Sequence, residues 1–128
     1  MQDKILYEYA IIRLVPRPER GEFINIGVIL FAKRTGFLEV LYKLDENRIL
    51  TLYPETNIEE IKIHLQSFHG IAKGVNPGSP IATQDAPSRF RWLTAKRSTV
   101  IQTSEVHPGF CEDPVSALKK LHQELVEN

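Results

Sequence analysis

The sequence has little cysteine, no net charge and no long apolar segment. Its single cysteine, Cys111, excludes a disulfide within the chain and is typical of proteins from a reducing compartment. The 16 basic residues balance the 16 acidic ones, so the positive excess of most nucleic-acid-binding domains is missing. These absences argue against a secreted disulfide scaffold and against a nucleic-acid-binding protein.

No segment indicates a membrane or an export function. The longest apolar run, 24–32, is interrupted by Asn25 and is too short to cross a bilayer. Residues 1–4 do not begin a cationic segment followed by an apolar run and a small-residue cleavage site. We therefore expect a cytoplasmic protein with no membrane partner.

Motifs that define a chemistry are also absent. The sequence has no phosphate loop of the Walker type, no GxSxG and no HExxH. His107 and Cys111 could supply two metal ligands, but a zinc site needs a third and a fourth. The same pair could instead form a thiolate nucleophile, although the proline and glycine between them leave its geometry open. We expect no metal, no cofactor and no catalytic residue.

What the sequence contains is typical of one globular domain. A chain of 128 residues with 42% apolar and 25% charged residues can build a single core. We predict one domain over 1–128.

Apolar segments in the first part of the chain predict three strands, over 4–15, 22–33 and 37–44. Short turns join them, which predicts antiparallel hairpins. The first strand carries apolar residues on both faces, and Arg13 shares one of these faces with Tyr7, Tyr9, Ile11 and Val15. We therefore expect this strand inside the sheet. We expect the second strand to be central as well.

Capping residues predict three helices. Asp45 precedes a short helix that ends near residue 52, and Asn57 precedes a helix that Gly74 ends. Asp113 and Pro114 open the last helix, because an acidic cap followed by proline suits a first helical turn.

The segment between the second and third helices predicts no further helix. We expect a loop over 75–88, two short strands over 90–94 and 99–103 that could pair as a hairpin, and irregular structure over 106–111. The resulting order, βββααββα, favours an α+β domain. Its expected architecture is a mainly antiparallel sheet of about five strands with helices packed on one face.

The second predicted strand contains two residues that core packing does not explain. Asn25 would bury an amide, which costs about 1–3 kcal/mol without partners. Gly27 weakens a strand and marks a bulge or a close approach of a backbone or ligand; we expect Trp92 to pack over it. Before this strand, Arg20 and Glu22 could orient an anionic ligand or a partner carboxylate, or form a simple turn salt bridge.

Basic residues cluster around Phe90 and Trp92. The cluster comprises Arg89, Arg91, Lys96 and Arg97, followed by Ser98 and Thr99. Such interleaving can bind single-stranded nucleic acid or a nucleotide through phosphate contacts and stacking. It also fits a strand with the two aromatic residues inside and the arginines outside. The turn 96–99 is the best anion-binding candidate in the chain.

Several ordered segments carry a resemblance to a known family. They are Arg13-Leu14-Val15-Pro16, the stretch 20–31, Phe90-Arg91-Trp92-Leu93, the stretch 97–102 and Val106-His107-Pro108-Gly109. Over nearly the whole chain the sequence resembles a bacterial family called domain of unknown function 3037. The resemblance implies no defined reaction. It implies a partner or operon role beside kinase-like proteins of the HipA type.

We therefore predict a non-catalytic protein-interaction or accessory module, for which the resemblance implies a HipA-type kinase-like partner. The alternative is a binding protein or enzyme for a small anionic or nucleotide ligand. The candidate binding residues are Arg20, Glu22, Asn25, Arg97, Ser98, Thr99 and His107. We expect the first three to form one wall of a site and the segment 97–107 to form the other. The sequence is also compatible with a homo-oligomer.

Overall fold

The computed structural model describes residues 4–76 and 78–127. In chain order its elements are β1 (Ile5–Leu14), β2 (Ile24–Ala32), the 3-10 helix η1 (Lys33–Thr35), β3 (Phe37–Tyr42), α1 (Glu46–Leu52), α2 (Ile58–Lys73), the 3-10 helix η2 (Pro80–Thr83), α3 (Ala86–Leu93), β4 (Ile101–Thr103), β5 (His107–Cys111), α4 (Pro114–His122) and its π-helical continuation η3 (Gln123–Glu127). The predicted α+β class is confirmed.

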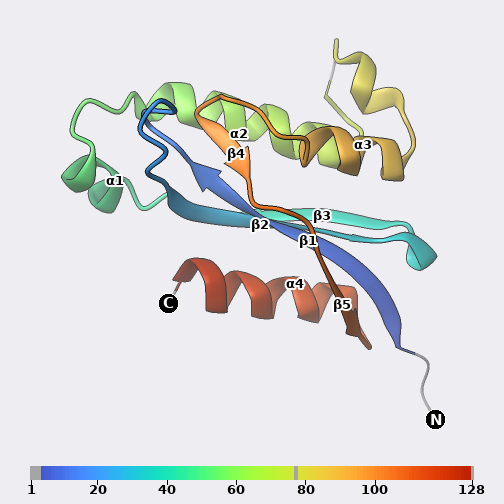
Figure 1. The fold of residues 1–128 in the computed structure, drawn as a ribbon. Helices are drawn as coiled ribbons and strands as arrows, with labels where there is room; N and C mark the ends of the chain where they lie inside the picture. Colours follow the sequence, from blue (N-terminus) through green and yellow to red (C-terminus); the bar gives the residue numbers. More distant parts are fainter. Residues whose placement is uncertain (1–3, 77, 128) are drawn as a thin grey trace.

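The sheet is antiparallel and has the order β3-β2-β1-β4. β5 also pairs with β1, but with its first half, while β4 pairs with its end. β4 and β5 thus follow one another along the same side of β1 (Figure 1). Between them, the Ser104 backbone N–H donates to the Ile11 carbonyl at 2.8 Å and continues the ladder. β1 and β2 are therefore interior strands, as predicted.

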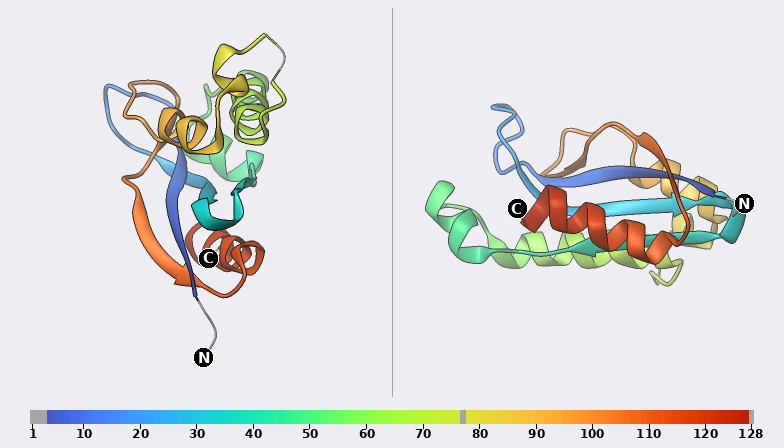
Figure 2. Two further views of the ribbon diagram at one scale, coloured as in Figure 1. Left: turned by 90° about the vertical axis from the view of Figure 1, so that its right-hand side faces the viewer. Right: turned by 90° about the horizontal axis from the view of Figure 1, so that it is seen from below.

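Helices cover both faces of the sheet, which corrects the expectation that they pack on one. α2 and α3 lie on one face and α4 lies on the other, so that the end-on view in Figure 2 shows three layers. The larger core lies beneath α1, α2 and α3, where Ala10, Ile12 and Leu14 of β1 are buried. Ile12 and Leu14 are fully buried there.

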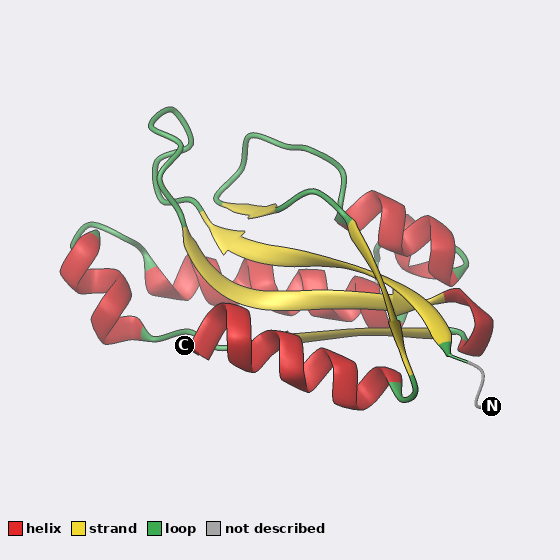
Figure 3. Ribbon diagram, turned by 60° about the horizontal axis from the view of Figure 1, so that its bottom comes forward, coloured by secondary structure: helices red, strands yellow, loops and turns green. Residues whose placement is uncertain are grey.

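A second, smaller core lies beneath α4. Val28 and Leu30 of β2 are fully buried against Leu118 of α4, and Tyr7 and Tyr9 of β1 pack at its side. α4 runs along this face of the sheet (Figure 3). The sheet needs this helix because β1 and β2 are apolar on both faces.

The helix starts match the predicted caps. Asp45 accepts from the Arg48 N–H at 3.1 Å, Asn57 from the Glu60 N–H at 3.1 Å, and Asp113 from the Val115 N–H at 3.2 Å. Gly74 ends α2 with a left-handed φ of 73°, which glycine adopts without strain.

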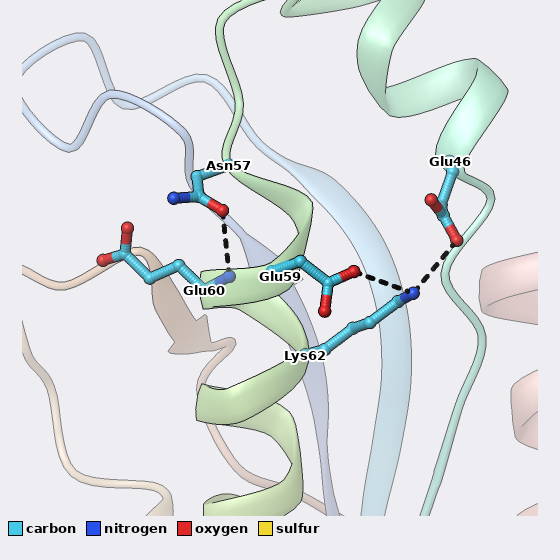
Figure 4. Close-up of polar contacts among 5 residues, drawn as sticks. All are labelled: Glu46, Asn57, Glu59, Glu60 and Lys62. Carbon is cyan, nitrogen blue, oxygen red and sulfur yellow. Dashed lines mark hydrogen bonds and ion pairs between the residues drawn. The ribbon is translucent and has the colours of Figure 1, made fainter.

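Lys62 links α1 to α2. Its ammonium lies 3.4 Å from a Glu46 carboxylate oxygen and 3.4 Å from one of Glu59 (Figure 4). The two carboxylates raise the pKa of Lys62, with Glu46 contributing most. This contact joins the short α1 to the first turns of its longer neighbour.

Three predictions for the segment 75–111 are wrong. The expected strand over 90–94 is the end of α3, so no hairpin forms with 99–103, of which only Ile101–Thr103 is a strand. The expected loop over 75–88 contains η2 and the start of α3. The segment 106–111, expected to be irregular, contains β5. The predicted number of five strands is confirmed: β4 lies within the strand expected over 99–103, and β5 takes the place of the strand expected over 90–94.

Candidate functional site

A β-bulge shapes the entrance of β2. Ile12 is paired with Gly27 and Arg13 with Asn25, so Ile26 is an extra residue in β2. Bulges of this kind bend a strand and re-aim its side chains, and they are frequent next to functional sites. Here the bulge sets Arg13 and Asn25 side by side.

Gly27 is required by the neighbouring strand. A Cβ atom at this position would lie 2.5 Å from the Leu41 carbonyl oxygen and 2.8 Å from the Tyr42 Cβ. The predicted close approach of another backbone is thus confirmed. The predicted packing of Trp92 over this glycine is wrong, because β3 occupies that space.

Asn25 contacts the C-terminal end of the helix on the second face. Its Nδ2 donates to the Leu125 carbonyl at 3.2 Å. Its Oδ1 is buried, and no described residue donates to it. Asn25 lines a cavity of about 150 Å³ whose other polar lining residues are Lys43, Asp45, Arg48 and Glu127. The Asn25 Nδ2 thus donates to a helix carbonyl, while its Oδ1 has no donor among the described residues beside the small polar cavity.

Arg13 stands at the centre of a polar row across the sheet. Its cross-strand neighbours are Asn25 on β2 and Gln102 on β4. Its guanidinium carbon lies 4.1 Å from the centroid of the Phe23 ring, which holds the planar group by a cation–π contact. Its Nε is buried without a partner among the described residues, and none of them forms an ion pair with it.

An open cleft of about 810 Å³ adjoins this arginine, and we name it the Arg13 cleft. It is lined by Arg13, Thr94, Lys96, Arg97, Ser98, Gln102, Thr103, Ser104, Glu105 and Val106. Three of these side chains are cationic and one is a carboxylate, so the lining carries two net positive charges. The Lys96 ammonium lies 3.8 Å from the Glu105 carboxylate. The uncompensated charge is therefore that of the two guanidinium groups, which suit an anion with planar oxygen pairs.

Arg97 is held in place by Trp92. Its guanidinium carbon lies 3.9 Å from the centroid of the indole ring, and its Nη2 donates to the Trp92 carbonyl. Burial lowers the pKa of Arg97 from its ordinary value, yet arginine stays charged at neutral pH. The residue is thus a fixed positive charge on the wall of the cleft.

The other predicted site residues lie elsewhere. Arg20 and Glu22 form the simple turn salt bridge, with 2.7 Å between Nε and Oε1, and both side chains are exposed. Thr99 donates its hydroxyl to the Ile101 carbonyl. His107 packs against the Tyr9 ring, with 5.5 Å between centroids.

The expected two-walled site is therefore not formed. Asn25 lines the small cavity, Arg97 and Ser98 line the Arg13 cleft, and His107 lines neither. The expected convergence of these residues on one pocket is wrong. What the structure brings together is Arg13 and the first three residues of the predicted turn 96–99.

His107 and Cys111 do not form a nucleophilic pair. They lie four residues apart along β5, which separates their Cα atoms by about 13 Å in an extended strand. The Tyr7 ring lies over Gly109 between them. Burial raises the pKa of Cys111, and Asp113 raises it further, so the thiol form is favoured. Among residues 4–76 and 78–127, no three His, Cys, Asp or Glu side chains are grouped to hold a metal ion.

The sequence interpretation did not include Arg13 and Gln102 among the site residues. The available signal was the position of Arg13 on an otherwise apolar strand face, because a charge placed among buried neighbours needs a reason. Gln102 gave no signal, since its role depends on which strand β4 joins.

Comparisons with known proteins give one family. A family model described as a protein of unknown function (DUF3037) matches residues 9–126, which is nearly the whole chain. No curated protein and no solved structure matches the chain. Within the described part of the chain, no helix is long and apolar enough to cross a membrane.

Proposed function

The chain belongs to the DUF3037 family, and we propose that it is a non-catalytic binding module for a small anionic ligand, held in the Arg13 cleft. One observation carries the proposal: Arg13 points a guanidinium without an ion-pair partner among the described residues toward a cleft that Arg97 also lines. The single cysteine supports a reducing, cytoplasmic location for this function.

The physical argument starts from the energetic cost of Arg13. A partly buried charge without a counter-ion is unfavourable, and a bound anion would remove that cost. Phe23 and Trp92 hold the two guanidinium planes, so little side-chain entropy is lost on binding. Ser98, which also lines the cleft, adds a hydroxyl donor. These groups fit a phosphate or a carboxylate.

A thermal-shift experiment with inorganic phosphate, pyrophosphate and citrate tests this proposal. A ligand present at about 100 times its Kd adds about 2.7 kcal/mol to the free energy of unfolding. We expect pyrophosphate to raise the Tm of the wild type. It should leave the Tm of Arg13→Met and of Arg97→Ala unchanged. The matched control is Arg20→Ala, which removes an exposed arginine outside the cleft. Equal shifts in all four proteins, or no shift with any anion, would overturn the proposal.

A second function is favoured by an exposed apolar pair. Leu6 on β1 and Phe110 on the edge strand β5 are direct cross-strand neighbours, 52% and 67% exposed. Large apolar side chains left in solvent at a sheet edge favour contact with another protein. We infer that this edge serves an accessory role toward a partner, for which the family resemblance suggests a HipA-type kinase-like protein.

Co-expression tests this second function. We expect a HipA-type protein from the same bacterium to co-purify with the wild type and to be lost with Phe110→Ser. Ile63→Ser is the control, because Ile63 is 65% exposed on α2. Absence of a complex at micromolar concentration would contradict the assignment.

A further inference from the structure

A smaller hollow of about 170 Å³ lies beside the Arg13 cleft and shares part of its wall. Arg97, Gln102 and Thr103 line both spaces. The two spaces differ in chemistry, because the cleft is lined mainly by charged and polar side chains, while the hollow combines an apolar wall with His64, Ser67, Thr99 and the three shared residues. Its apolar residues include Phe68, Ile71, Trp92, Leu93, Val100 and Ile101. We name it the Trp92 hollow.

The aromatic ring of this hollow is unusually placed. Trp92 is 42% exposed, whereas Phe90 and Leu93 of the same helix are buried in the core. The indole ring is thus less buried than the side chains of Phe90 and Leu93, and the Arg97 guanidinium is stacked on its face. An indole stacked on a guanidinium presents flat, polarisable surface, which is the kind of surface on which nucleobases stack.

Polar groups at the border of the two spaces can read the edge of a ring. The Gln102 Nε2 donates to the Thr99 carbonyl at 2.8 Å. No described residue donates to the Gln102 Oε1, so this atom can accept from an exocyclic amino group. Thr103 donates to the Thr94 carbonyl at 3.4 Å, and its oxygen keeps acceptor capacity. The border thus offers hydrogen-bond acceptors, while the cleft offers cationic donors.

We propose that the ligand is a nucleoside phosphate, with its phosphates in the Arg13 cleft and its base in the Trp92 hollow. The inference rests on the proposed anion-binding function and adds the class of ligand. The two net positive charges of the cleft lining match a phosphate monoester dianion or a diphosphate. Arg97 lines both spaces. Its guanidinium plane is stacked on the indole, which leaves its N–H edge for a phosphate.

The chain contains a single tryptophan, so the intrinsic fluorescence of Trp92 reports on the hollow without a label. We expect AMP and GMP, which carry the same single phosphate as ribose 5-phosphate, to quench this fluorescence on titration. Pyrophosphate and ribose 5-phosphate should bind without comparable quenching. In calorimetry both nucleotides should bind about tenfold or more tightly than ribose 5-phosphate, since stacking of one base contributes about 1–3 kcal/mol.

Two variants separate the base from the phosphates. Trp92→Leu should abolish the advantage of AMP over ribose 5-phosphate, which carries the same single phosphate. The indole also orders Arg97, but loss of that contact weakens both monophosphates alike and cancels from their affinity ratio. Trp92→Phe keeps a ring for folding and should retain part of the advantage. Arg13→Met should weaken all four probes.

The outcomes distinguish the two proposals. If pyrophosphate binds and the nucleotides bind no more tightly than ribose 5-phosphate, the nucleotide inference is overturned and the anion-binding function stands. If no phosphate compound binds, both are overturned. If Trp92→Leu and Trp92→Phe both keep the full advantage of AMP over ribose 5-phosphate, the base does not occupy the Trp92 hollow and the inference fails.

Discussion

Arg13 and Asn25 are direct cross-strand neighbours only because β2 has an extra residue at Ile26. Without it, the register from Ile12 onward would set Asn25 opposite Leu14, which is fully buried in the larger core. Directly opposite residues of an antiparallel pair share a face. The bulge therefore moves a polar side chain from the core face to the face of α4, next to the arginine of the cleft.

The proposed role of Arg13 in anion binding predicts that binding and stability place opposite demands on this residue. Arg13→Met keeps an unbranched side chain on the Phe23 ring and removes a charge that has no ion-pair partner among the described residues. We expect the free energy of unfolding to rise by about 1 kcal/mol while pyrophosphate binding is lost. Urea denaturation and calorimetry measure the two effects. Arg20→Met should change stability by less than about 0.5 kcal/mol. A loss of stability in Arg13→Met would indicate a structural arginine instead.

Gly27 should tolerate no side chain. Gly27→Ala places a methyl group against backbone and Cβ atoms of β3, which cannot move without breaking the sheet pairing. We expect a loss of about 3 kcal/mol, at the upper end of ordinary overpacking costs. Gly109→Ala is the comparison, because there the methyl group meets only the far end of the Tyr7 ring. Gly109→Ala should lower the free energy of unfolding by about 1 kcal/mol. In a protein that already carries Tyr7→Ala, the same substitution should not change it further. Similar costs at both glycines would contradict this difference.

The sheet and the helix caps could be predicted because their signals are local. The caps Asp45, Asn57 and Asp113 act on residues two or three positions away. The prediction of a strand over 90–94 was wrong because the alternation of basic and aromatic residues over 89–92 is too short to distinguish a strand from a helix. In the helix, Phe90 and Leu93 share one face. Asp85, with proline at the second helical position, carried a start signal similar to that of Asp113 with Pro114, and this signal could have corrected the prediction.

The site was less predictable because it depends on long-range pairing. Pro108 and Gly109 suggested irregular structure, yet an edge strand accepts a proline, and the glycine makes room for the Tyr7 ring. The turn 96–99 was proposed as an anion-binding candidate from its residue types, and residues 96–98 of it line the Arg13 cleft. Its main companion, Arg13, lies more than 80 positions earlier in the sequence, so only the pairing of β1 with β4 brings them together.

The N-cap of α2 should contribute measurably to stability. Asn57→Ala removes the side-chain acceptor of the Glu60 N–H (Figure 4), and we expect a loss of about 1 kcal/mol. Asn57→Ser keeps an acceptor at this position and should stay within about 0.5 kcal/mol of the wild type. Urea denaturation followed by circular dichroism gives both values. Equal losses in the two variants would show that the side-chain acceptor is not what matters.

His69 should make the protein less stable in mild acid. Burial lowers the pKa of His69 below its usual 6.5, Lys73 lowers it further, and Glu39 opposes the shift. The unfolded state therefore binds more protons, so stability falls as the pH drops below about 6.5 and the loss is complete below the folded-state pKa. His69→Gln should flatten the dependence of Tm on pH between about 7 and 5. Parallel curves for the two proteins would contradict this assignment.

Ser104 should hold β4 and β5 in line along β1. Its buried hydroxyl accepts from the Ile11 N–H at 2.8 Å and donates to the Glu105 carbonyl at 2.9 Å. Ser104→Ala leaves a part-buried backbone N–H without that acceptor, so we expect a loss of about 2 kcal/mol. Hydrogen exchange of the Ile11 amide should accelerate more than that of Ile12, because the lost bond belongs to Ile11 alone. Ser98→Ala is the control, because Ser98 is exposed. It should change neither the free energy of unfolding nor the exchange rate of the Ile11 amide. If Ile11 stayed protected in Ser104→Ala, the ladder across the break would rest on the backbone bond from Ser104 alone.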